Sequence, residues 1–226
     1  MSGSSYVGFV DVGFLKAEGA RLLGAKPGMV RPEAQAVVDW FKGLDCGAVD
    51  GASFVRAYWY DGAFEPGHSE YQGQRQFFDA IAFTPGVQLR LGHIAERTPR
   101  LEKPIVDALR STGVALGIEA DKLIAEFRRH WTFHPERHQK GVDTLIALDL
   151  VRLAGRGNFG TAVLLAGDRD VAEAVRAAQD FGQRVVVATP SRRSLARELA
   201  QLADEVVDLD EATVRAMLKF RAVPAP

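Results

Sequence analysis

The sequence has little of several features that mark particular protein classes. Cys46 is the only cysteine among 226 residues, so no disulfide can form within the chain and a reducing compartment is expected. The formal net charge is -1, so any contact with nucleic acid must come from a local basic patch. No Gly-x-Gly-x-x-Gly turn follows a strand-like run, which argues against a nicotinamide enzyme.

Long apolar runs are also absent. The strand-like run at residues 6–10 is far shorter than the roughly 20 residues that cross a bilayer. The N-terminus has no basic segment followed by an apolar one. We therefore expect a cytoplasmic protein with no membrane partner. Hydrophobic residues make up 47% of the chain, which is enough for a large core, and residues 221–226 are expected to be frayed.

Strand-like and helix-like segments alternate along the chain. This alternation predicts an α/β fold, with a mostly parallel sheet and helices on both faces. Asp61-Gly62 is expected to end the second strand, and Pro32 to open the second helix. Residues 95–139 have little strand signal and are interpreted as an insertion or cap within a single domain, 1–226. Strands are expected at 6–10, 53–60, 87–94, 161–166, 184–188 and 205–209, and helices at 14–23, 32–44, 70–83, 103–130 (broken near Gly113 and Gly117), 141–154, 171–181, 195–202 and 211–220.

Four aspartates stand at strand ends or at a helix start. Asp11 follows the first strand-like run, Asp168 and Asp170 follow a later one, and Asp143 opens the helix expected at 141–154. The C-terminal ends of parallel strands converge in the crevice where open α/β sheets bind ligands, so these carboxylates are expected to meet. Clustered carboxylates raise one another's pKa values unless a cation neutralises them, and hard oxygen ligands suit Mg²⁺ or Mn²⁺. The pattern predicts metal-dependent phosphodiester chemistry.

Each aspartate also has an ordinary structural interpretation. Asp11 could cap the following helix, and Asp143 could stabilise the positive end of its own helix. Capping explains the pair Asp168 and Asp170 less well, because two carboxylates near Asp11 are costly without a cation. Asp149 lies roughly 240° around the helix from Asp143. It therefore either reaches the site from the side or pairs with a basic residue.

Basic residues near these positions are candidate phosphate ligands. Lys140 either lies near a scissile phosphate as a point charge or is a solvated loop charge. Residues 130–140 combine histidine, arginine and aromatic side chains with a proline that interrupts any continuous helix. A loop that grips a nucleic-acid strand, through Arg137 and His138, is favoured over a zinc site. The pair Arg192 and Arg193 could also hold a phosphate backbone, with Arg192 as the candidate ligand and a solvated turn as the alternative.

Three motifs, in this order along the chain, carry a resemblance to a known family. They are residues 7–15 (VGFVDVGFL), 140–150 (KGVDTLIALDL) and 164–170 (LLAGDRD). Together they resemble the NYN domain family of PIN-like nucleases, whose sheet is Rossmann-like, and the likeness extends from about residue 6 to 210. The resemblance implies a metal-dependent endoribonuclease that uses Mg²⁺ or Mn²⁺ on single-stranded or structured RNA. It carries the family's acidic roles to Asp11, Asp143, Asp168, Asp170 and Asp149.

The chain also departs from the family pattern. Phe14 stands where many members have asparagine, and the connection at 103–139 is longer than usual. These departures motivate an alternative, in which the fold binds RNA or protein with little turnover. A haloacid-dehalogenase-like phosphatase is disfavoured, because that chemistry needs an acid two residues after Asp11, where Gly13 stands. The sequence leaves the RNA target, the metal count and the oligomeric state open, a homodimer included.

Overall fold

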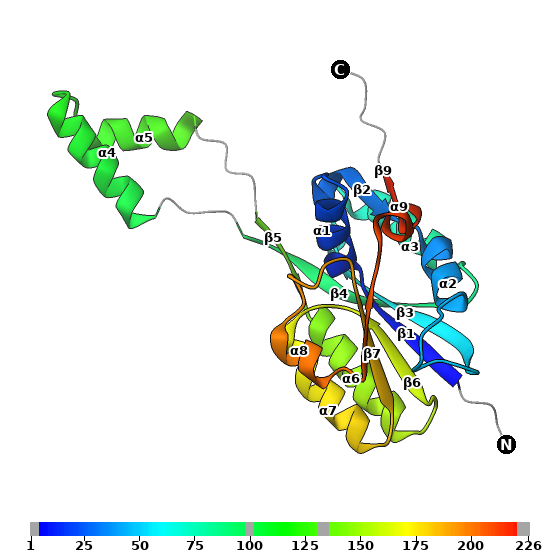
Figure 1. Ribbon diagram of the computed structural model, residues 1–226. Coiled ribbons are helices and arrows are strands. Elements are labelled where there is room, and N and C mark those ends of the chain that lie inside the picture. Colours follow the sequence, from blue (N-terminus) through cyan, green and yellow to red (C-terminus); the bar gives the residue numbers. More distant parts are fainter. Residues whose placement is uncertain (1–4, 98–101, 131–135, 221–226) are drawn as a thin grey trace. The chain divides into compact units, whose positions relative to one another are not determined.

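The computed structural model describes residues 5–97, 102–130 and 136–220 (Figure 1). Contacts divide the chain into two compact units, one of Met1–His93 with Gln139–Pro226 and the other of Ile94–His138. The second unit has nearly the bounds of the expected insertion, residues 95–139, whose role as a cap stays a prediction. The expected fraying of 221–226 concerns residues outside the described ranges.

The chain forms a seven-stranded sheet with the order β5-β4-β3-β1-β6-β7-β8. Every neighbouring pair from β4 across to β8 is parallel. The expected mostly parallel α/β sheet is therefore confirmed. The strands are β1 (Ser5–Asp11), β3 (Ser53–Ala63), β4 (Val87–Arg97), β5 (Glu136–Lys140), β6 (Thr161–Leu165), β7 (Arg184–Thr189) and β8 (Glu205–Asp208).

Helices cover both faces of the sheet, as the sequence predicts (Figure 1). One face packs against α1 (Val12–Leu22), α2 (Ala34–Lys42), α3 (Tyr71–Ala82) and α9 (Glu211–Met217). The other packs against α6 (Val142–Gly155), α7 (Ala172–Asp180) and α8 (Arg197–Leu202). Within the described residues, no helix is both long enough and apolar enough to cross a bilayer.

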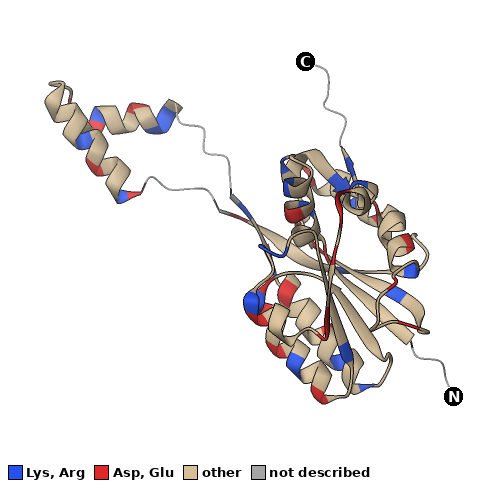
Figure 2. Cartoon of the chain, viewed as in Figure 1, with Lys and Arg blue, Asp and Glu red and all other residues tan. Residues whose placement is uncertain are grey.

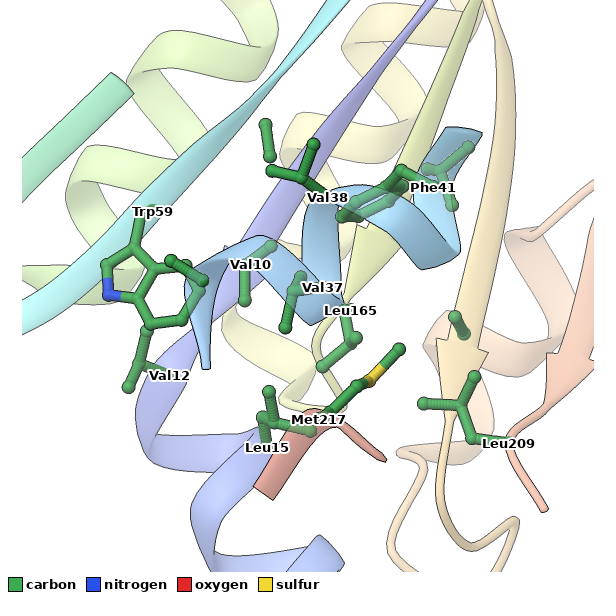
Figure 3. Close-up of a cluster of buried hydrophobic side chains, with 14 of the residues drawn as sticks. Val10, Val12, Leu15, Val37, Val38, Phe41, Trp59, Leu165, Leu209 and Met217 are labelled. Carbon is green, nitrogen blue, oxygen red and sulfur yellow. The ribbon is translucent and has the colours of Figure 1, made fainter. Parts of the chain in front are cut away.

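The central strands are buried on both faces, which explains their uninterrupted apolar runs. In β1, Tyr6 and Val10 belong to one core cluster, and Val7 and Phe9 belong to the other. Figure 3 shows the first cluster, in which Val10 lies among side chains from α1, α2 and α9. Two cores therefore hold β1 from opposite sides, and the position where the strand ends is set by close packing.

Two expected helix boundaries are wrong for a common reason. Pro32 lies in strand β2 (Val30–Pro32), not in the first turn of α2, and Leu218–Phe220 forms strand β9, not the end of the last helix. The two strands pair antiparallel with Pro32 opposite Leu218. Leu218 is buried against Gly19, where an added Cβ would lie 2.5 Å from Leu218 Cδ1. This pairing joins segments more than 180 residues apart in the sequence, so no local pattern predicts it.

Two strand expectations also fail. Asp61 and Gly62 do not end β3 but continue it, because Asp61 pairs with Leu91 of β4. Strand β5 lies in a segment with little strand signal, since its sequence, ERHQK, is entirely polar. An edge strand needs no apolar alternation, because its hydrogen bonds to one neighbour are enough to define it.

The second unit contains a helical hairpin of α4 (Lys103–Ala115) and α5 (Ala120–His130). Gly113 was expected to break this helical region, but it lies inside α4. There it allows close packing, because an added Cβ would lie 3.2 Å from Ala120 Cα. Gly113 and Ile124 are the buried residues of the two helices as described, so the hairpin has almost no core of its own.

Candidate metal centre

Two adjacent parallel strands deliver aspartates to the same edge of the sheet. Asp11 ends β1, and Asp168 follows β6 after two residues, with Val10 and Leu165 paired in register. Each also caps the helical segment that follows it. Asp11 Oδ1 accepts from the Phe14 amide at 3.0 Å, and Asp168 Oδ1 accepts from the Asp170 amide at 3.1 Å. The capping interpretation is thus realised, and it fixes each carboxylate at the strand end.

Helix α6 brings a third carboxylate to this edge. Gly141 precedes the helix with a φ of 80°, a backbone conformation that residues with a Cβ rarely adopt. This turn takes the chain from β5 into α6, and Asp143 lies in the first helical turn. Carboxylate oxygens of Asp143, Asp168 and Asp170 all lie within 4.8 Å of one another.

The aspartates border a cavity of about 550 Å³. Asp11, Asp143 and Asp168 line it, together with Gln139 of β5 and Phe14 of α1. Asp11 is 9% exposed, Asp143 is half-buried, and Asp168 and Asp170 are exposed. Asp11, Asp143 and Asp168 therefore line one cavity, and Asp170 is grouped with Asp143 and Asp168. Asp11 is the most buried of the four and lies outside that group.

The charges of this cluster are poorly compensated. Burial raises the pKa of Asp11 to about 6, and the charge of Asp143 adds to the rise against the opposing Phe14 amide. The pKa of Asp143 is also raised, first by burial and then by the charges of Asp168 and Asp170. Ionised carboxylates that repel one another in this way favour a bound cation. Three oxygen donors at this spacing, with no nitrogen or sulfur ligand among them, fit a hard divalent ion.

Asp61 is a site-proximal residue that the sequence analysis missed. It lies in β3 beside the end of β1, is 7% exposed, and accepts from Gln139 Nε2 at 2.8 Å. Burial raises its pKa to about 6, although the charge of Lys16 opposes the rise. The available signal was its position after an apolar run, equivalent to that of Asp11, but the following glycine favoured a turn.

Phe14 packs directly across the loop that carries Asp168. An added Cβ at Gly167 would lie 2.2 Å from the Phe14 ring, so only glycine permits this contact. Phe14 also lines the cavity, so an apolar ring stands beside the acidic cluster. The departure from the family pattern at this position thus changes the cavity wall and leaves the carboxylates in place.

Asp149 has a different environment from the other four aspartates. Its Oδ2 accepts from Arg90 Nε at 2.9 Å and from the Tyr60 hydroxyl at 3.1 Å. Its Oδ1 accepts from Arg152 at 2.5 Å. Of the two interpretations from sequence, pairing with basic residues is the one the structure shows, and Asp149 is not in the group that could hold a metal.

The predicted phosphate ligands lie in different places. Lys140 is exposed at the end of β5, whereas its neighbour Gln139 lines the cavity. Arg137 and His138 are exposed and belong to the second unit, where Arg137 pairs with Glu96 at 2.9 Å. The middle of that expected gripping loop, residues 131–135, lies outside the described ranges.

Arg192 is held away from the cavity wall. Its Nε donates to both oxygens of Asp208, at 2.8 and 2.9 Å, and Nη2 donates to the Val206 carbonyl. The next residue, Arg193, lines the cavity instead. The sequence identified the arginine pair, and Arg192 was the candidate ligand. The conformation of the turn decides which of the two arginines faces the cavity, and that arginine is Arg193.

The NYN domain model matches residues 29–210, which is most of the chain. The chain is a member of the NYN domain family. NYN domains are generally RNA-related, PIN-like nucleases that use divalent metal ions. Asp143, Asp168 and Asp170 lie within the matched range, whereas Asp11 precedes it.

Two proteins without assigned functions are similar to this NYN domain chain. An uncharacterized protein of Sinorhizobium fredii, y4oD, is 42% identical over 90 residues, which cover 39% of this chain. The chain spans only 42% of that relative's length. A protein of unknown function from Vibrio parahaemolyticus, known from a crystal structure, is 15% identical in sequence. The structural match covers 96% of this chain and 97% of that protein's chain, with a TM-score of 0.50. The second likeness supports the fold alone.

Proposed function

We propose that this NYN domain protein is a metal-dependent endoribonuclease. Asp143, Asp168 and Asp170 would hold Mg²⁺ or Mn²⁺, with Asp11 as a fourth carboxylate in the same cavity. The observation that supports this most directly is the group of carboxylates within 4.8 Å of one another, beside the buried Asp11 in one cavity. Membership of the family supports RNA as the substrate.

The chain's own residues supply position and charge. The capping hydrogen bonds hold Asp11 and Asp168, so their carboxylates need little reorganisation to bind a cation. A divalent ion held there would lower the pKa of an attacking water and offset charge on the phosphate and on the leaving 3′-oxygen. No side-chain nucleophile is required, and a 5′-phosphate product is expected from the family resemblance.

The test is cleavage of single-stranded RNA by the purified protein in Mn²⁺. Asp143→Asn is expected to lower the cleavage rate by about 100-fold or more, because it removes one charged donor from the cation site. The matched control is Asp180→Asn, an exposed aspartate at the end of α7 that does not line the cavity. Equal activity of folded Asp143→Asn and wild type, checked by circular dichroism, would reject the assignment.

A second candidate function is RNA binding with little turnover. The observation that favours it is Phe14, which places an apolar ring in the cavity wall where a polar contact is usual in the family. Binding of RNA by wild type without cleavage in Mn²⁺ would support this alternative, and a gain of cleavage in Phe14→Asn would assign the low turnover to the Phe14 ring. Cleavage by wild type would dismiss it. The cytoplasmic location and a homodimer stay predictions.

A further inference from the structure

Two consecutive arginines have different environments. Arg192 is fully engaged by Asp208 and the Val206 carbonyl. Arg193 has no ion-pair partner among the described residues, although it lines a cavity that contains three aspartates. An arginine that borders carboxylates without pairing with them keeps its guanidinium donors available for another anion.

The turn that presents Arg193 is tied down by its own hydrogen bonds. The Ser191 carbonyl accepts from Thr189 Oγ1 at 2.9 Å and from Ser194 Oγ at 2.8 Å. The Arg193 amide donates to Ser191 Oγ at 3.3 Å. The turn is also joined to the aspartate-bearing loop, because the Ala196 amide donates to the Gly167 carbonyl at 2.9 Å. The backbone of Arg193 is therefore held at a set distance from the strand end that carries Asp168.

The overall charge of the protein cannot attract a polyanion. The formal net charge is -1, and Figure 2 shows acidic and basic residues intermixed along the helices. Binding of a phosphodiester strand therefore depends on individual cations placed where the strand must run. Arg193 is such a cation, since it shares the cavity wall with the candidate metal ligands.

We propose that Arg193 binds a backbone phosphate of the RNA strand, next to the phosphate held at the aspartate cluster. This rests on the proposed function for the identity of the substrate. The guanidinium offers a planar set of donors that matches two phosphate oxygens. One phosphate would thus be bound through the cation site and its neighbour through Arg193, which fixes the strand's path across the cavity.

The test compares Arg193→Ala with Arg197→Ala. Arg197 opens α8 four residues later, is exposed, has no ion-pair partner among the described residues and does not line the cavity. Both changes remove one positive charge from the same region, so they differ in direct contact and not in net charge. Binding of a fluorescein-labelled single-stranded RNA is measured by anisotropy in an Asp143→Asn background, where cleavage does not interfere.

Arg193→Ala is expected to weaken binding about tenfold and to lower the slope of log affinity against log salt by about 1. Arg197→Ala is expected to change affinity less than about twofold, because an exposed charge that contacts no phosphate is screened. Arg193→Lys should recover part of the affinity, since it keeps the charge without the planar fork. In the cleaving protein, Arg193→Ala should raise KM more than it lowers kcat.

The binding readout separates this proposal from the proposed nuclease function. Wild type that binds RNA but does not cleave it would reject the nuclease, while a selective loss in Arg193→Ala would still support the phosphate contact. Equal losses of RNA affinity in the Arg193 and Arg197 variants would overturn the contact, because the loss would then depend on net charge and not on position. Undiminished binding by Arg193→Ala, or no RNA binding by the wild-type protein, would overturn it as well.

Discussion

Asp143 and Asp149 lie on the same helix, α6, yet their surroundings are opposite. Asp149 is 6% exposed and satisfied by Arg90, Arg152 and the Tyr60 hydroxyl. Asp143 is half-buried and faces other carboxylates, so its pKa is raised first by burial and then by their charges. A buried carboxylate with cationic partners is a structural element, whereas one among like charges stores electrostatic repulsion that a cation relieves.

On this helix, Asp149 is therefore expected to contribute to stability and Asp143 to metal-dependent function. Removing the charge of Asp149 should harm folding, because the buried Tyr60 hydroxyl and the partly buried Arg90 would lose their acceptor. Removing a charge at the cavity should help the metal-free protein to fold and should harm only metal-dependent properties. Three measurements sharpen or break this distinction.

The largest expected change in stability follows Asp149→Ala. We expect a loss of about 3 kcal/mol in the free energy of unfolding, because Arg90 and the Tyr60 hydroxyl lose their shared acceptor. Urea unfolding followed by circular dichroism measures this loss. Asp143→Ala is the control from the same helix, and it should unfold at no lower urea concentration than wild type. Equal destabilisation by both substitutions would break the comparison.

The next effect concerns pH and Asp61. Its folded pKa of about 6 lies above the ordinary aspartate value of 3.8, so the folded state retains a proton that the unfolded state releases between these values. Stability therefore falls as pH rises through this window, and the penalty is fully present above it. Asp61→Asn removes the penalty and retains an oxygen acceptor for Gln139.

Asp61→Asn is expected to stabilise the metal-free protein by about 2 kcal/mol at pH 8 and to change little at pH 4. Urea unfolding at both values, with EDTA present, gives the difference. Asp39→Asn, which changes an exposed residue of α2, is the control, and its stability should follow that of wild type at both pH values. A destabilised Asp61→Asn protein at pH 8 would show that Asp61 is paired as Asp149 is, contrary to its assigned environment.

The smallest effect is stabilisation by the metal itself. Mn²⁺ at ten times its dissociation constant should stabilise wild type by about 1.4 kcal/mol at pH 8, because only the folded state assembles the site. The thermal unfolding temperature should rise accordingly, and rise less at pH 5, where Asp11, with its pKa of about 6, is protonated. Asp143→Asn should lose most of the shift and Asp149→Asn should keep it. A shift that survives Asp143→Asn would place the cation elsewhere.

Local sequence patterns were sufficient to predict elements whose residue types are set by burial on both faces of the sheet or by helix capping. The apolar runs of β1, β6 and β7 predicted the parallel core, and the aspartates after β1 and β6 predicted the acidic edge. The order of the three motifs along the chain indicated the NYN family, to which the chain belongs. Local signals failed at the β2–β9 pair and at β5, because pairing partners that are distant in sequence, not side-chain periodicity, define those strands.

The sequence by itself determined the α/β class and which carboxylates stand at strand ends, because alternation, hydrophobic burial and helix capping act between neighbours in the chain. Only the tertiary structure decided the environment of each charge. It paired Asp149 with Arg90, placed Asp61 beside Gln139, and directed Arg193 to the cavity while Arg192 met Asp208. The physical reason is that the energy of a charge depends on its distance to other charges and to water, and folding sets those distances.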